Sequence, residues 1–143
     1  MEKFSLLIIL FILILMGCSS NVNENVTFAG KDVINISLNA NSNYEQSQKE
    51  SFKSNTFKDA DSMTIFIEAI KNVERMGGVL NYIAEFNMTV NFKDKSSTEY
   101  HISLGNEIED EGLLVELSNT VQGYIIQKED AQKLREIIYY RNE

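Results

Sequence analysis

Two runs of alternating apolar and polar residues constrain the fold more than any other feature of this sequence. In FNMTVNF, residues 86–92, every second side chain is apolar, and TEYHISL, residues 98–104, repeats the pattern. A period of two places successive side chains on opposite faces of a strand. Because only the polar segment 93–97 separates the runs, we expect an antiparallel hairpin with one buried and one wet face.

Two other segments have the period of a helix. The segment 60–76 has apolar side chains along one face: Met63, Phe66, Ile67, Ile70 and Val73. Asp59 or Asp61 can cap its start, and Gly77 and Gly78 can end it. The segment 128–140 has a second apolar stripe: Ala131, Leu134, Ile137 and Ile138. This spacing predicts two amphipathic helices that bury Phe66, Ile70, Leu134 and Ile137 against a sheet.

Three shorter segments complete the predicted sheet. Residues 33–38 alternate, and LLVEL and YIIQ, residues 113–117 and 124–127, flank a turn. The order is then strand, helix, four strands, helix, which is unlike the regular alternation of a parallel doubly wound sheet. We therefore predict an α+β fold, with an antiparallel sheet of four or five strands and two helices packed on one face.

The amino terminus has a different character. Residues 4–16 include one polar side chain, Ser5. This run is shorter than the ~20 residues of a membrane span and fits the apolar region of a secretory signal, about 7–15 residues. The quartet Leu15-Met16-Gly17-Cys18 resembles the lipobox of bacterial lipoproteins, in which the cysteine sulfur takes a diacylglyceryl group and cleavage makes that cysteine the first residue. An uncleaved anchor and an ordinary signal peptide are the alternatives.

These observations predict the domain organisation and location. Residues 1–17 are a lipoprotein signal peptide, Cys18 is the lipidation site, and residues 18–32 are a polar, flexible tether. Residues 33–143 form one α+β domain, in which 39–55 is a long polar loop. The chain has 1 cysteine, so a disulfide or a thiolate metal site within one chain is excluded. The predicted location is the extracytoplasmic face of the cell membrane, with the protein held there by a lipid anchor.

The charge of the chain limits its partners. The sequence has 21 acidic and 13 basic residues, a net charge of −8. This acidic balance argues against nucleic acid and against electrostatic attachment to anionic lipid. The expected partners are therefore the membrane, through the acyl anchor, and an unidentified envelope protein, peptide or wall component.

Few residues suggest chemistry. His101 is the single histidine, and the alternation places it on the polar face of its strand, where a solvated role is expected. Glu107, Glu109 and Glu111 precede Gly112 with the spacing of an EF-hand loop. Ser118 stands where that loop needs a bidentate glutamate, so these three glutamates are weak calcium candidates, and a solvated acidic tip is the other interpretation. The motifs of nucleotide, serine-hydrolase and zinc-protease sites do not occur.

Three classes of function fit this sequence. The predicted one is a membrane-anchored, non-catalytic binding module of the cell envelope, without cofactor or metal. The alternative is a small-ligand or weak calcium-binding lipoprotein that uses the acidic loop 107–111. A carboxylate hydrolase has the least support, because no pair of acids has a meaningful spacing.

The order of segments also resembles a known family. The helix FKDADSMTIFIEAIKN, the GG after it, the hairpin FNMTVNFKDKSSTEYHISLG, the LLVELSNTVQGYII pair and the helix KEDAQKLREII are similar to those of YhfM-like lipoproteins of Gram-positive, spore-forming bacteria. The resemblance spans roughly residues 56–139 and agrees with the lipobox. It implies a domain of unknown function, with no established active residues to carry over.

Overall fold

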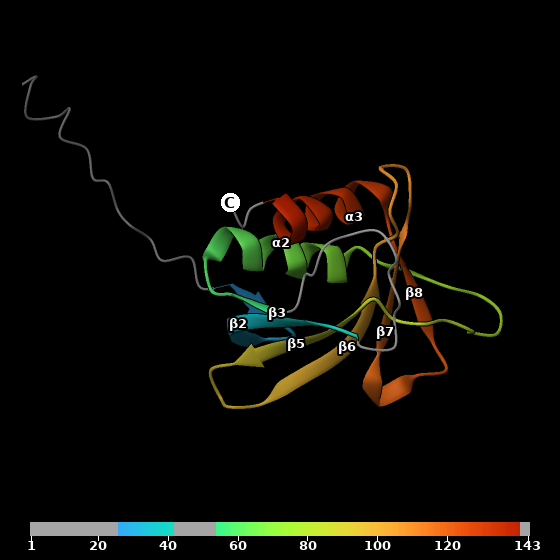
Figure 1. Ribbon diagram of the computed structural model, residues 1–143. Coiled ribbons are helices and arrows are strands. Elements are labelled where there is room, and N and C mark those ends of the chain that lie inside the picture. The colour runs from blue at the N-terminus through green and yellow to red at the C-terminus, as the bar shows by residue number, and fades with distance from the viewer. Residues whose placement is uncertain (1–25, 42–53, 141–143) are drawn as a thin grey trace, which may run out of the picture.

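A computed structural model describes residues 26–41 and 54–140. The predicted signal peptide, Cys18 and most of the tether lie outside the described residues. The chain forms one curled antiparallel sheet with two helices over one face (Figure 1). In order, its elements are β1 (Thr27–Phe28), β2 (Lys31–Ala40), β3 (Ser54–Phe57), α2 (Ala60–Lys71), β4 (Glu74–Arg75), β5 (Phe86–Phe92), β6 (Ser97–Ser103), β7 (Gly112–Glu116), the 3-10 turn η1 (Leu117–Asn119), β8 (Gly123–Ile126), α3 (Lys128–Arg135) and its π-helical continuation η2 (Glu136–Tyr140).

The strand order confirms the α+β class and the antiparallel sheet. It runs β1-β2-β5-β6-β7-β8-β4, and β3 also pairs with β2. The sheet has eight strands, so the predicted four or five was wrong. The three strands that were missed, β1, β3 and β4, are only two to four residues long. Segments this short do not establish a period. The pairing partners of β3 and β4 also lie well apart from them in the chain.

The first helix is shorter than predicted. Asp59 is its N-cap, and the Asp59 carboxylate accepts a 2.9 Å hydrogen bond from the Ser62 N–H. The helix ends at Lys71, because the next residues form β4 and pair with β8. The predicted end at residue 76 was therefore wrong, and Gly77 lies beyond the helix.

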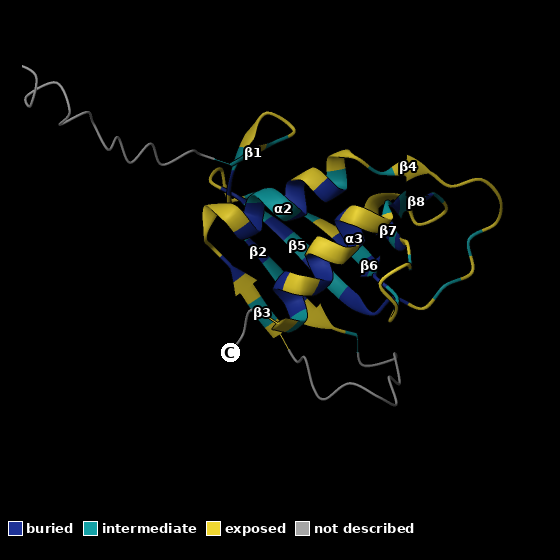
Figure 2. Ribbon diagram, turned by 90° about the horizontal axis from the view of Figure 1, so that it is seen from above, coloured by how far each residue is buried: buried dark blue, intermediate teal, exposed yellow. Residues whose placement is uncertain are grey.

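The core lies between the sheet and the helices, where Figure 2 shows the buried sides of α2 and α3 turned toward the strands. Phe66 and Leu134 are each 1% exposed, Ile137 is 5% exposed, and Ile70 is partly buried against the same cluster. The rings of Phe57 and Phe66 lie 4.9 Å apart. The helical stripes were therefore predicted correctly as core.

The two segments predicted to lack regular structure are partly strands. Residues 27–28 and 31–32 of the predicted tether lie in β1 and β2. At the two ends of the predicted loop 39–55, β2 extends to Ala40 and β3 begins at Ser54, while residues 42–53 lie outside the described residues. Within the described part of the chain, no helix has the length and apolar character needed to cross a membrane.

Candidate binding surface

The outer face of the sheet, opposite the helices, is divided into two halves. The chain leaves β4 beside β8 but must next enter β5, which pairs with β6. It makes this return through residues 76–85, here called the strap, which turns back and crosses the strands (Figure 1). The strap contacts the outer side of β6, β7 and β8. The outer side of β2, β3 and β5 remains as the second half.

The middle of the strap packs closely on the sheet. A Cβ on Gly123 would lie 2.7 Å from Leu80 Cδ1 and 3.2 Å from Leu113 Cδ1, so glycine is what lets Leu80 approach β8. The Tyr82 hydroxyl lies 2.8 Å from His101 Nδ1, and the two rings meet edge to face at 5.7 Å. Burial raises the pKa of Tyr82. The strap therefore forms a packed cover over this half of the sheet.

A buried carboxylate anchors the end of the strap. Glu85 is 4% exposed, and its two oxygens accept 3.1 Å hydrogen bonds from the N–H groups of Leu104 and Gly105. The Glu85 N–H donates to the Ser103 hydroxyl at 3.2 Å. These bonds satisfy a charge that would otherwise be costly to bury. They also join the strap to the end of β6.

In the second half, the outward side chains of β2 from Asn35 to Asn39, of β3 and of β5 are uncharged and polar, and they are half-buried or exposed. Residues opposite one another in neighbouring strands share a face, and the register pairs Ser37 with both Thr56 and Thr89. We call this surface the open polar face. Its residues are Asn35, Ser37 and Asn39 of β2, Ser54 and Thr56 of β3, and Asn87, Thr89 and Asn91 of β5.

Hydrogen bonds connect side chains across the open polar face. The Asn91 amide donates to Asn35 Oδ1 at 2.8 Å. The Ser37 hydroxyl lies 3.4 Å from both Asn35 Oδ1 and the Thr56 hydroxyl. Side chains held in this way lose less conformational entropy when a partner binds.

Two residues of β6 border the open polar face. Glu99 is paired with Thr89, and His101 with Asn87. The alternation in the sequence correctly placed His101 on this side of the sheet. It did not predict the Tyr82 partner, because the residues of the strap show no periodic pattern of apolar side chains. Where the strap crosses the sheet depends on where β4 pairs. His101 is therefore half-buried at the edge of the strap.

The acidic loop between β6 and β7 is organised by a residue that the sequence reading did not select. Glu107, Glu109 and Glu111 are all exposed, and Glu109 lies 3.2 Å from the Lys128 ammonium. Asp110 instead accepts 2.9 Å hydrogen bonds from the N–H groups of Glu107 and Asn106, which lower its pKa. Across residues 26–41 and 54–140, no three His, Cys, Asp or Glu side chains group in a way that could hold a metal ion.

The same loop is bound from the helix side by Arg135, which was also missed. Arg135 is 5% exposed, and its guanidinium donates to the carbonyl oxygens of Leu104, Ile108 and Asp110. The sequence could have indicated that Arg135 is buried, because it stands four residues after Ala131 and three before Ile138, within the apolar stripe of the helix. A charged residue in such a stripe requires a buried partner.

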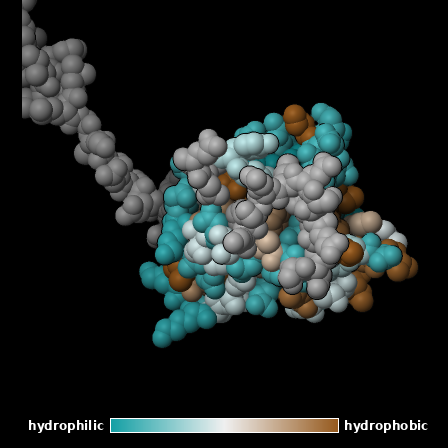
Figure 3. All heavy atoms as spheres, in the orientation of Figure 1, coloured by the Kyte–Doolittle hydropathy of each residue, from teal (hydrophilic) through white to brown (hydrophobic). Residues whose placement is uncertain are grey.

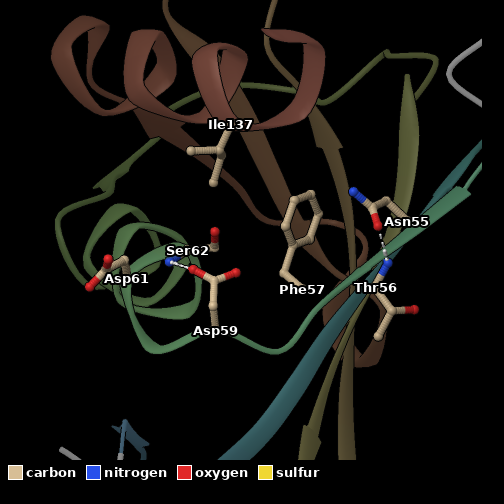
Figure 4. Close-up of a pocket in the computed structure, with 7 residues that line it drawn as sticks. All are labelled: Asn55, Thr56, Phe57, Asp59, Asp61, Ser62 and Ile137. Carbon is tan, nitrogen blue, oxygen red and sulfur yellow. Dashed lines mark hydrogen bonds between the residues drawn. The ribbon is translucent and has the colours of Figure 1, made fainter. Parts of the chain in front are cut away.

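A pocket of about 380 Å³ lies where the start of α2 faces β3 and η2 (Figure 4). Phe57 and Ile137 provide its apolar lining. The Asp59 carboxylate faces this space, whereas Asp61 points to the other side of the first helical turn. Because Asp59 already caps α2, its role here is accounted for by the helix.

Comparison with known proteins identifies the domain. A family model described as YhfM protein matches residues 36–143, which is well over half of the chain. The chain belongs to the YhfM family. No curated protein and no solved structure gives a significant match. The YhfM match includes the strap, Arg135 and all of the open polar face except Asn35.

Proposed function

We propose that this YhfM protein is a membrane-anchored extracytoplasmic lipoprotein whose domain is a non-catalytic binding module for a component of the cell envelope. The observation that carries the binding proposal is the open polar face. It is a set of hydrogen-bonding side chains on three neighbouring strands, held in register and left half-buried or exposed. Amides and hydroxyls of this kind form hydrogen bonds but do not titrate near neutral pH, which favours recognition over proton transfer.

The anchor is supported by the sequence. The apolar run, Gly17 and the single cysteine of the chain coincide at residues 4–18. Each buried CH₂ of an acyl chain contributes about 0.8 kcal/mol, and one chain alone binds a membrane only marginally. A diacylglyceryl group on Cys18 supplies two chains. Stable attachment then needs no help from a protein whose net charge is −8.

Mass spectrometry of the protein from growing cells tests the anchor. We expect a chain that begins at Cys18 and carries the mass of a lipid on that residue. The variant Cys18→Ser should keep residues 1–17, because it lacks the thiol that accepts the lipid. An unmodified Cys18, or a parent chain that begins at Met1, would show that the anchor and the location are wrong.

Site-specific crosslinking in intact cells tests the binding surface. A photoreactive residue at Thr89, which is half-buried on the open polar face, should crosslink to an envelope component. The same residue at Gln132, exposed on α3 on the helix side, is the matched control. Equal crosslinking from both positions would contradict the choice of surface.

A further inference from the structure

We propose that one corner of the domain rests on anionic lipid headgroups and thereby sets which side of the domain faces the membrane. The inference rests on the lipid anchor proposed above: the lipid holds the protein, and the corner orients it. We call this surface the basic corner. Its four exposed lysines are Lys31 of β2, Lys71 of α2, and Lys93 and Lys95 of the turn between β5 and β6.

The chain enters the domain at the basic corner. The Val26 carbonyl accepts a 2.8 Å hydrogen bond from the Val33 N–H, and the Lys93 N–H donates to the Asp32 carbonyl at 3.0 Å. The first described residue thus lies beside the start of β2 and the turn that follows β5. Val26 stands eight residues after Cys18, a span of at most about 29 Å. A lipid on Cys18 therefore keeps this corner close to the membrane surface.

Two lysines of the corner are held in place by aspartates. The Lys31 ammonium lies 2.9 Å from the Asp94 carboxylate and 5.3 Å from the centroid of the Phe92 ring. The Lys93 ammonium lies 3.9 Å from the Asp32 carboxylate. Because the four lysines outnumber these two aspartates, the corner keeps a positive charge.

The other two lysines have no such partner. The Lys71 ammonium lies 3.4 Å from the Thr27 carbonyl, and Lys95 is exposed in the turn itself. Within the described part of the chain, neither of them forms an ion pair. The backbone of Lys95 has a φ of +69°, in the region that favours glycine or asparagine. Lysine at this position gives the turn a charge that can bind a lipid phosphate.

The other end of β6 is acidic. The loop between β6 and β7 contains four acids, and two nearby cations, Lys128 and Arg135, offset them only in part. The four acids are Glu107, Glu109, Asp110 and Glu111. The seven residues of β6 separate this loop from the turn of the basic corner by about 20 Å. Figure 1 shows the turn and the loop at opposite ends of the strand.

This separation explains how a protein with a net charge of −8 can meet an anionic surface. The field of such a surface falls off within a Debye length, which is about 8 Å at physiological salt. When the corner touches the lipid, its lysines lie within that distance and the acidic loop lies beyond it. The reverse orientation would bring four carboxylates into a repulsive field. The charge distribution therefore selects the basic corner as the side that faces the membrane.

The strap is the competing surface for contact with lipid. Its exposed apolar side chains include Val79 at 95% and Ile83 at 63%. Figure 3 shows hydrophobic atoms where the strap turns back, whereas the turn between β5 and β6 is hydrophilic. Figure 2 shows β1 and the strap on different sides of the domain, so a chain that enters at β1 does not lead to the strap. The polar headgroup region suits the basic corner better.

Amine footprinting of the full-length protein in vesicles tests the proposal. An uncharged, membrane-impermeant amine reagent modifies lysines to a low extent, and mass spectrometry gives the rate at each one. We expect the rates at Lys93 and Lys95 to be at least about threefold lower on phosphatidylglycerol than on phosphatidylcholine. Salt at about 0.5 M should remove the difference, because it screens the charges. Lys128, beside the acidic loop, is the internal control and should react alike on both lipids.

Matched variants show whether the corner itself is responsible. Lys93→Gln combined with Lys95→Gln should abolish the protection of Lys31, because two of the charges that orient the domain are gone. Lys128→Gln combined with Lys133→Gln removes the same charge from α3 and should leave Lys31 protected. Thermal unfolding shows whether a loss of protection comes from a loss of folding. If a variant proves unstable, the footprint of the parent still decides.

The outcomes separate this inference from the proposed anchor. Equal rates on the two lipids at Lys93 and Lys95, or equal protection of Lys128, would overturn the basic corner. Insertion of the strap would give such equal rates, because burial of apolar side chains does not depend on lipid charge. In each case the anchor stands or falls separately, on the mass of Cys18. An unmodified Cys18 with protected corner lysines would refute the anchor and support the corner, since residues 4–16 can hold the full chain in the vesicle.

Discussion

The two halves of the outer sheet face differ in the side chains that they carry and in whether the strap covers them. On β7 the outward residues Leu113 and Val115 are apolar, and Val115 is 0% exposed. On β5 the outward residues Asn87, Thr89 and Asn91 are polar and half-buried. The difference follows from the strap, which covers the first half. A sheet can thus have one face closed by helices and the other face only partly closed by a connecting segment.

The covered half also depends on how the strap is held. At its start the Met76 N–H donates to the Gly123 carbonyl at 2.9 Å, and the Gln122 amide donates to the Met76 carbonyl at 3.0 Å. At its end Glu85 binds two backbone N–H groups. The strap is therefore tied at both ends, whereas the side chains of the open polar face are half-buried or exposed.

The largest expected loss of stability is in the covered half and comes from a change at Glu85. Glu85→Ala leaves the N–H groups of Leu104 and Gly105 without their carboxylate, and hydrogen bonds to charged groups contribute about 1.5–3 kcal/mol. We expect a loss of roughly 2–4 kcal/mol in the free energy of unfolding, measured with urea. Glu99→Ala, which removes an exposed carboxylate at the border of the open half, should change it by less than about 0.5 kcal/mol. Equal losses would contradict the anchoring role of Glu85.

A smaller effect tests the packing of the strap. Gly123→Ala places a methyl group 2.7 Å from Leu80 Cδ1, and overpacking of this kind costs about 1–3 kcal/mol. Because the end of a leucine side chain can move, the lower half of that range is expected. In the double variant with Leu80→Ala the two effects should not add, since the second change removes the clash. Strict additivity in urea unfolding would show that Leu80 does not lie over β8.

The next effect is limited to acid and lies at the hairpin between β5 and β6. Hydrogen bonds from Ser96, followed by that from Lys31, lower the pKa of Asp94 from 3.8 to about 2. A lowered pKa means that the ionised group stabilises the folded state above about pH 4, and this contribution is lost as the pH falls toward 2. Asp94→Asn should remove that part of the pH dependence. Unfolding measured between pH 2 and pH 5 checks it, and an unchanged profile in the variant would contradict the assignment.

The smallest expected effect is on the open half itself. Asn39 is exposed at the end of β2, so Asn39→Ala should change the free energy of unfolding by less than about 0.5 kcal/mol. A binding surface is expected to tolerate such changes in stability while losing affinity for its partner. A loss above about 2 kcal/mol in urea unfolding would mean that this side chain supports the fold rather than a partner.

The elements that were predicted from the sequence share one property, which is a pattern repeated over many residues. The hairpin of residues 86–104 and the apolar faces that contain Phe66 and Leu134 were all recognised in this way. The strands β1, β3 and β4 were missed because two to four residues cannot show a period. Their existence depends on pairing, as when β4 meets β8 about fifty residues later in the chain.

The candidate site was predictable only in part. Alternation in FNMTVNF predicts a polar outer side for β5, and alternation in TEYHISL placed His101 on the polar face of its strand. The continuous apolar run Leu113-Leu114-Val115 is typical of a strand covered on both sides, but it does not say what covers it. The partners of Glu85 and Arg135 could not be predicted either, because both side chains bind backbone groups of a loop that has no sequence pattern.

The sequence by itself determined which side of each long strand and helix is buried, because burial follows the local period of apolar residues. It also contained the signal that we propose to be a lipid anchor at Cys18. The tertiary structure alone decided which half of the outer face the strap covers. The reason is topological: β4 pairs with β8 at one side of the sheet, so the strap must cross β8, β7 and β6 before it enters β5, and it leaves β2, β3 and β5 uncrossed.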